Sequence, residues 1–166
     1  MTPNKIIFLD IDGVLNCSTT TSRIGVHPFV DDKKIDLLKT ILDATDAKIV
    51  LSSSWRYGAF TTATAEEQLF LMELLRVFRE HGLELWHSVT SPSADGCLHR
   101  GKEILKWLEN NPGVEKWVVI DDVAEDLDGV MDHAVITTWE NGLTKALAKR
   151  IIDMLNEGEN QYGSNL

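Results

Sequence analysis

The sequence predicts an α/β protein, with a mostly parallel five-stranded sheet between two layers of helices. Apolar runs rich in β-branched residues recur along the chain, and each ends in polar residues, which is typical of strands buried on both faces of a parallel sheet. Helical patterns lie between these runs. Alternating strands and helices favour a three-layer α/β/α sandwich joined by right-handed crossovers.

The strands are predicted from the runs that carry this pattern. KIIFL ends in Asp-Ile-Asp-Gly, AKIVL ends in three serines, and WVVI ends in two aspartates. ELWH and AVIT are weaker candidates of the same kind. The predicted strands are therefore 5–9, 47–51, 84–87, 117–120 and 134–137.

The helices are predicted from apolar residues that recur on one helical face. In the second of them the expected buried stripe consists of Leu69, Met72, Leu75, Val77 and Phe78. The predicted helices cover 32–44, 66–80, 102–110 and about 143–156.

Composition and length favour one compact domain. The chain has 166 residues, 43% of them apolar, so a single core needs no disulfide or metal to support it. We expect a single domain over 1–157 and a flexible C-terminal tail over 158–166, because GENQYGSNL lacks a helical or strand pattern.

Charge and hydropathy narrow the classes of partner. A formal net charge of −10 argues against sequence-independent binding to nucleic acid, which depends on Lys and Arg. No apolar run reaches the roughly 18 residues of a membrane span, and the first such run is broken by Asp10, so no signal peptide is predicted. These features predict a soluble cytoplasmic protein, and no obligate protein partner is evident.

The polar residues that end the three strongest strands are expected to meet at one edge of the sheet, where ligands of such sheets bind. They are Asp10, Asp12, Ser52, Ser53, Asp121 and Asp122. Carboxylates gathered this closely repel one another, and a hard divalent cation such as Mg²⁺ is the simplest remedy. Either acidic pair taken alone would be read as ordinary exposed loop residues.

This arrangement suits phosphoryl transfer. Asp10 could attack phosphorus, because carboxylates form aspartyl-phosphate intermediates. Asp12 could protonate the leaving oxygen and then deprotonate the attacking water. The serines after the second strand offer donors for phosphate oxygens, although serine is common in any turn.

The same stretches resemble, in order, the motifs of the haloacid dehalogenase (HAD) superfamily of phosphohydrolases. DIDGVLN resembles its first motif, DxDGxL; IVLSSSWR resembles the second; RGKEILKWL takes the place of the third; and WVVIDD, followed by Asp126, resembles the acidic fourth. The match spans residues 5 to 126. The combination further resembles a small HAD group associated with nucleic-acid repair proteins.

The resemblance implies a Rossmann-like fold and a Mg²⁺-dependent phosphatase that works through an aspartyl-phosphate. Asp10 would be the nucleophile and a metal ligand, and Asp12 the acid/base, with its carbonyl as a second ligand. Ser52 would hold the phosphoryl group, with Ser53 as the alternative, and the basic residue would be Arg100 or Lys102. Asp122 would bind Mg²⁺ directly, with Asp121 in the inner or outer shell.

The gaps between these motifs are too short for the large cap domain that many HAD enzymes carry, so none is expected. An open site favours a bulky substrate, such as a nucleic-acid end, and still admits a nucleotide or another small phosphoester. Trp55 and Arg56 are candidate substrate contacts, because an aromatic beside a cation can stack on a base or clamp phosphate. Trp55 in the core and Arg56 in a surface ion pair is the competing interpretation.

The remaining tryptophans, Trp86, Trp107, Trp117 and Trp139, lie within apolar patterns and are predicted to be core residues. Two other functions compete with a phosphatase. A phospho-receiver signalling domain is disfavoured because AVIT runs into Thr138 and Trp139 without the Lys that ends a receiver's last strand. A non-catalytic phosphate-binding module is disfavoured because every motif position holds a competent residue.

Overall fold

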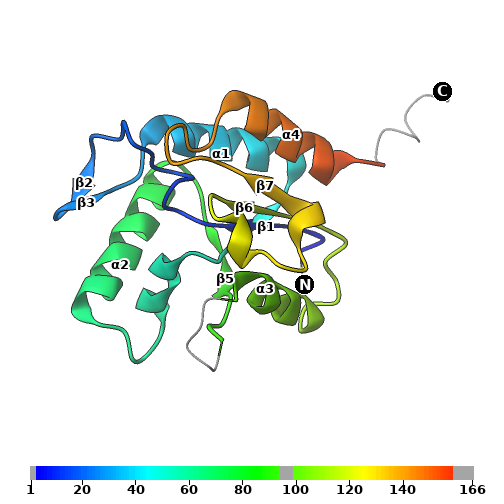
Figure 1. Ribbon diagram of the computed structural model, residues 1–166, viewed down its shortest axis with the longest axis horizontal. Helices are drawn as coiled ribbons and strands as arrows, with labels where there is room; N and C mark the ends of the chain where they lie inside the picture. The colour runs from blue at the N-terminus through cyan, green and yellow to red at the C-terminus, as the bar shows by residue number, and fades with distance from the viewer. Residues whose placement is uncertain (1–2, 94–98, 159–166) are drawn as a thin grey trace.

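The computed structural model describes residues 3–93 and 99–158. Its main sheet has five strands in the order β5-β4-β1-β6-β7, and all four neighbouring pairs are parallel (Figure 1). The predicted strands are confirmed to within two residues at either end. They are β1 (Lys5–Leu9), β4 (Lys48–Leu51), β5 (Leu85–Val89), β6 (Lys116–Asp121) and β7 (Ala134–Ile136).

The four longest helices lie where the apolar pattern predicts them. They are α1 (Asp32–Thr45), α2 (Ala65–Glu80), α3 (Arg100–Glu109) and α4 (Lys145–Asn156). In Figure 1 α1 and α4 cover one face of the sheet and α3 covers the other, which confirms the three-layer α/β/α fold. The apolar pattern misses the shorter elements: a hairpin of β2 (Arg23–Ile24) and β3 (His27–Pro28), and the 3₁₀ helices η1 (Ser54–Ala59), η2 (Ala124–Asp126) and η3 (Met131–His133).

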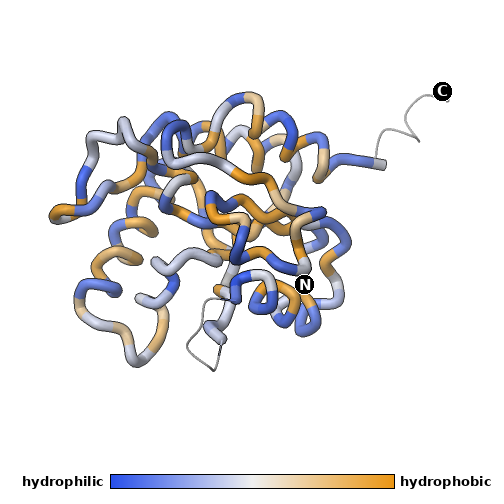
Figure 2. The backbone as a smooth tube through the Cα atoms, viewed as in Figure 1, coloured by the Kyte–Doolittle hydropathy of each residue, from blue (hydrophilic) through white to orange (hydrophobic). Residues whose placement is uncertain are grey.

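The hydrophobic core consists of two clusters, because successive side chains of the central strand β1 point to opposite faces of the sheet. Ile7 and Leu9 of β1 belong to the larger cluster, which also takes in the apolar faces of α1, α2 and α4. Ile6 and Phe8 point to the opposite face and pack with Ile104 of α3. Figure 2 shows the strands between these layers as strongly hydrophobic. β1 is thus buried on both faces, and only its end can carry polar groups.

Helix α2 begins at a capping box, in which Thr64 Oγ1 accepts from Glu67 N at 3.2 Å and Glu67 Oε2 accepts from Thr64 N at 2.7 Å. Its predicted buried stripe is partly wrong: Leu69 and Met72 are 49% and 66% exposed. Its buried residues are Leu71, Leu74, Val77 and Phe78. Apolar residues occur almost all round this helix, so periodicity alone could not select the face that meets η1.

The segments where HAD enzymes insert caps are short. The first holds the β2–β3 hairpin, and the second holds η1, α2 and β5. Within the described residues there is therefore no large cap domain, as predicted. The predicted tail lies outside the described residues from position 159 onward. In the described part of the chain, no helix combines the length and apolar character needed to cross a membrane.

The prediction that all the remaining tryptophans are core residues is wrong for one of them. Trp107 is buried, with 7% exposed, and packs edge-on against Phe8. Trp139 is 46% exposed. It follows β7 in the connection to α4, past the end of the sheet.

Candidate active site

The predicted residues meet because three neighbouring strands end side by side. Leu9 pairs with Leu51 on one side and Ile120 on the other, so the residues that follow them share one level of the sheet. Backbone hydrogen bonds continue this register past the strand end, from Asp10 N to Ile120 O at 2.9 Å and from Ser52 N to Leu9 O at 3.0 Å.

Three carboxylates form a cluster at this edge. One oxygen each from Asp10, Asp121 and Asp122 lies within 4.8 Å of the other two. Asp10 is 6% exposed and Asp121 is fully buried. Burial raises the pKa of Asp10 to about 7; the charge of Arg100 opposes this shift and that of Asp121 adds to it. Burial and the charge of Asp121 also raise the pKa of Asp122. The cluster is thus short of positive charge.

Gly13 allows the cluster to close up. Its φ of +71° is strained for any residue with a side chain, and a Cβ here would lie 2.2 Å from Asp122 Oδ2. The glycine of the DxDG motif therefore lets the loop after β1 turn sharply and gives the Asp122 carboxylate its space.

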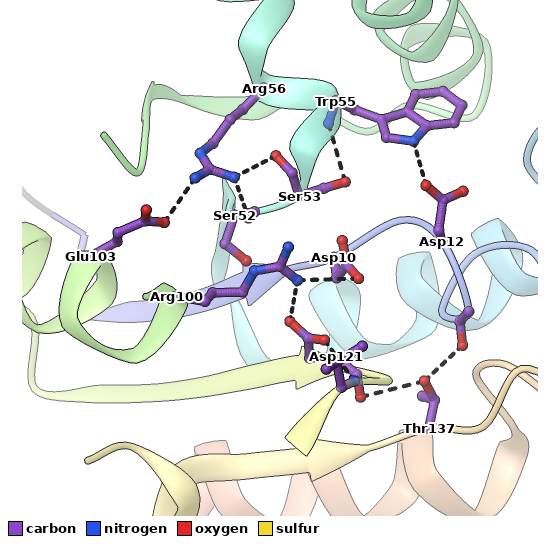
Figure 3. A network of polar contacts seen from close by, with 12 residues as sticks. Asp10, Asp12, Ser52, Ser53, Trp55, Arg56, Arg100, Glu103, Asp121 and Thr137 are labelled. Carbon is purple, nitrogen blue, oxygen red and sulfur yellow. Dashed lines mark hydrogen bonds and ion pairs between the residues drawn. The ribbon is translucent and has the colours of Figure 1, made fainter. Parts of the chain in front are cut away.

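Arg100 supplies the cationic side chain of the site (Figure 3). Its Nη1 lies 3.2 Å from Asp10 Oδ2 and also donates to Asp121 Oδ2. Burial alone would lower the pKa of Arg100, but the two carboxylates outweigh it and raise the pKa, so the guanidinium stays charged. The alternative residue, Lys102, is exposed on α3.

Gly101 holds the start of α3 in place. A Cβ on Gly101 would lie 2.1 Å from the carbonyl oxygen of Asp128, so the helix can approach the loop after η2 only with a glycine here. This close approach fixes the position of Arg100, the first residue of the helix.

The carboxylate cluster fits a hard divalent cation. All three groups are oxygen donors, the ligand type that Mg²⁺ and Ca²⁺ prefer. Asp121 is partly engaged, because its Oδ1 accepts from Val123 N at 2.9 Å and its Oδ2 accepts from Arg100. Asp10 and Asp122 are thus the better placed direct ligands. The Asp12 side chain is not part of the cluster.

Asp12 is exposed and held by two donors. Trp55 Nε1 donates to Oδ2 at 2.9 Å (Figure 3). Asn16 Nδ2 donates to Oδ1 at 2.8 Å. Asn16 is itself anchored, since its Oδ1 accepts from Gly13 N at 2.9 Å. The Trp55 indole is 7% exposed and stacks on Phe29 at a centroid distance of 5.8 Å. It therefore packs in the core and also orients Asp12.

The two serines differ in their contacts. Ser52 Oγ is buried and has no hydrogen-bond partner among the described residues. The Ser53 side chain accepts from Trp55 N at 3.3 Å, which starts η1, and it lowers the pKa of Asp10 through a hydrogen bond. A buried hydroxyl without a partner is costly, and Ser52 Oγ therefore has hydrogen-bonding capacity left for a bound group.

Arg56 does not face solvent, in contrast to its predicted role in substrate contact. It is fully buried, and its guanidinium donates to the carbonyl oxygens of Thr90, Ser52 and Ser53 at 2.7 to 2.9 Å. Its Nη2 pairs with Glu103 Oε2 at 2.7 Å. Figure 3 shows it on the far side of the serines from Asp12. Arg56 thus braces the end of β4 against α3.

Sequence reasoning missed three supporting residues. Asn16 holds Asp12, Glu103 neutralises Arg56, and Thr137 Oγ1 donates to Gly13 O at 2.7 Å. Thr137 follows β7 at the same edge of the sheet. The rule that singled out the polar residues after the other strands could therefore have identified it as well. No sequence pattern indicates the roles of Asn16 and Glu103, because the packing of loops and helices decides which residues they contact.

No curated protein sequence matches this chain. Among solved structures, the cobalt-bound form of the deoxy-D-mannose-octulosonate 8-phosphate phosphatase from Haemophilus influenzae aligns over 93% of this chain and 88% of its own. The identity is 12% and the TM-score 0.44.

The match to a protein-family model identifies the family of the chain. The model of the HAD domain in Swiss Army Knife RNA repair proteins matches residues 6–148, which include all four motifs. The match confirms the predicted resemblance to the HAD superfamily. The chain therefore belongs to the family of HAD domains found in Swiss Army Knife RNA repair proteins, and it is a HAD-like phosphohydrolase.

Proposed function

We propose that the chain is a Mg²⁺-dependent phosphomonoester hydrolase that works through an aspartyl-phosphate on Asp10. One observation carries the proposal: the Asp10 carboxylate lies at the end of the central strand, between the Arg100 guanidinium at 3.2 Å and the oxygens of Asp121 and Asp122 within 4.8 Å. Such a position poises one carboxylate for attack and surrounds it with groups that control charge.

In the first step a carboxylate oxygen of Asp10 attacks phosphorus, and the ester bond between phosphorus and the leaving oxygen breaks. Asp12, in its protonated form, gives its proton to that oxygen, and the alcohol leaves. In this structure Trp55 and Asn16 each donate a hydrogen bond to one oxygen of Asp12, and these two contacts orient its side chain.

In the second step Asp12 takes a proton from water as the water oxygen attacks the phosphorus of the aspartyl-phosphate. The bond between phosphorus and the Asp10 oxygen breaks, which releases inorganic phosphate and restores the Asp10 carboxylate. Asp12 is then protonated and ready for the next substrate. Each step breaks one bond to phosphorus and forms one.

Charge is controlled by Arg100, Ser52 and the metal site. Arg100 offsets the carboxylates beside the transferring group, and the Ser52 hydroxyl is assigned to a phosphoryl oxygen because it has no other partner among the described residues. Mg²⁺, held by Asp10 and Asp122 with Asp121 beside them, would offset the negative charge that the phosphate brings. Lys102 is left out of this assignment, since it is exposed.

The substrate class we propose is a nucleic-acid end or a nucleotide. Two features support it: the site has no large cap in the described part of the chain, and the family is named for RNA repair proteins. A substrate with its own bulk can exclude water from an open site.

The first test is a hydrolysis panel with and without Mg²⁺. It compares 3′- and 5′-phosphorylated oligonucleotides with free nucleotides, phosphoamino acids and an aryl phosphate. Mg²⁺-dependent release of phosphate, highest with the nucleic-acid substrates and lost in Asp10→Asn, is expected. Binding of phosphorylated ligands without release would favour a non-catalytic module, and full activity in Asp10→Asn would overturn the nucleophile assignment.

A further inference from the structure

A cleft of about 470 Å³ lies directly beside Asp12. Its lining includes Asp12, Trp55, Tyr57, Glu67, Phe70 and Trp139. The volume falls in the range of small-molecule sites. Since Asp12 is assigned to the leaving oxygen, whatever occupies the cleft is attached to the leaving side of the phosphoester.

Trp139 is the aromatic residue that projects into solvent here, with 46% of its surface exposed. Its backbone is nevertheless held: Ser18 N donates to Trp139 O at 2.8 Å, and Gly142 N donates to Thr138 O at 2.7 Å. Figure 1 shows this connection from β7 to α4 running beside the loop after β1. An exposed indole on a fixed turn adds little to the core, so its position calls for a partner outside the fold.

The other aromatic walls are already packed. Trp55 lies against Phe70 at a centroid distance of 5.2 Å, and the Arg56 guanidinium covers the Tyr57 ring at 4.9 Å. These contacts fix the shape of the cleft before a ligand arrives. Trp139, in contrast, is 46% exposed, so part of its side chain is open to a ligand.

The charged side chains that line the cleft favour some aromatic ligands over others. Its described lining contains the carboxylates of Asp12 and Glu67 and the imidazole of His27, but no Lys or Arg. A second phosphate is therefore disfavoured, whereas N–H and O–H donors are favoured, because carboxylates only accept hydrogen bonds. A nucleoside carries such donors on its base and sugar, and the side chain of phosphotyrosine carries none on its ring.

We propose that this cleft is the leaving-group subsite and that it binds the nucleoside next to the scissile phosphate, with its base stacked on Trp139. The proposal rests on the proposed function, since it depends on Asp12 facing the leaving oxygen. Trp139 is then a specificity-determining residue, which separates nucleoside esters from phosphoesters that lack an aromatic ring.

The test compares wild type with Trp139→Ala and Trp139→Phe on adenosine 3′- and 5′-monophosphate, ribose 5-phosphate and phosphotyrosine. Met131→Ala is the matched control, because Met131 has the same 46% exposure but lies on η3, outside the lining of the cleft. We expect Trp139→Ala to lower kcat/KM for the better nucleotide about tenfold, the order of effect of one lost stacked base. Ribose 5-phosphate should be unaffected, and Trp139→Phe should recover most of the loss.

An equal loss on ribose 5-phosphate, or none on either nucleotide, would overturn the proposal. So would a preference for phosphotyrosine with the same dependence on Trp139, which would assign the cleft to a peptide. If wild type hydrolyses neither these esters nor the phosphorylated oligonucleotides, the proposed function fails, but the cleft is still tested by calorimetry with adenosine monophosphates. A Kd weakened about tenfold in Trp139→Ala would support the subsite, and an unchanged Kd would overturn it.

Discussion

The buried ion pair between Arg56 and Glu103 can be tested by removing each partner in turn. The Arg56 side chain is 0% and the Glu103 side chain 3% exposed, and their closest atoms are 2.7 Å apart. Glu103 Oε1 also accepts from Ser93 N at 2.9 Å. Glu103→Leu keeps a similar volume at this position but leaves the guanidinium without its counter-charge.

The expected cost follows from burial. Removing one partner of a buried pair typically costs about 3–5 kcal/mol, because the other charge stays buried without compensation. Glu103→Leu should therefore lower the free energy of unfolding by this amount. Arg56→Met should cost a similar amount, since it strands the Glu103 carboxylate and removes the donor to the Ser52, Ser53 and Thr90 carbonyls. The double variant should be more stable than the sum of the two losses implies by about 2 kcal/mol.

The assay is urea unfolding at pH 7, followed by circular dichroism and analysed by linear extrapolation for all four proteins. A constant slope with urea shows that the variants unfold from comparable native states. Losses that simply add, to within about 0.5 kcal/mol, would show that the two side chains do not stabilise each other. Glu103→Leu that unfolds like wild type would refute the buried charge pair altogether.

Three further predictions concern the site itself. Asp10 has a higher pKa in the folded chain, about 7, than its ordinary 3.8, so the folded state binds more protons between these pH values. Without divalent cations, the free energy of unfolding of wild type relative to that of Asp10→Asn should therefore fall as the pH rises through this window. Urea unfolding in EDTA measures this difference, and a rise with pH would contradict the account. Gly13→Ala, which would bring a Cβ within 2.2 Å of Asp122 Oδ2, should weaken Mg²⁺ binding about tenfold by calorimetry, and an unchanged affinity would remove Asp122 from the site. Trp55→Phe, which keeps the ring but not the 2.9 Å hydrogen bond to Asp12, should lower kcat about tenfold; an effect confined to KM would argue against a positioning role.

The sheet and its edge could be predicted because they depend on local pattern. The strand end at Leu9 and the acids that follow it are visible in the sequence, and parallel strands place such ends together. That Arg100 reaches the site while Lys102 does not could not be predicted. It depends on the helical phase of α3 and on the close approach of Gly101 to Asp128.

Burial of polar and aromatic residues was harder to predict. Arg56 follows three serines and a tryptophan, which is typical of a surface loop, yet its partner Glu103 comes from a distant helix. Trp139 sits in an apolar pattern but emerges beyond the end of β7, where the sheet no longer covers it. In both cases tertiary packing, which leaves no local pattern, decides the environment.

The central claim is that Asp10 carries the phosphoryl group. Wild type and Asp10→Asn are mixed with Mg²⁺ and a hydrolysed ester, quenched in acid within the first turnover, digested and analysed by mass spectrometry. We expect one phosphoryl group, labile to hydroxylamine, on the wild-type peptide that contains Asp10, and none on that of the variant. Rapid turnover with no phosphorylated peptide, or with the phosphoryl group on another residue, would contradict the account.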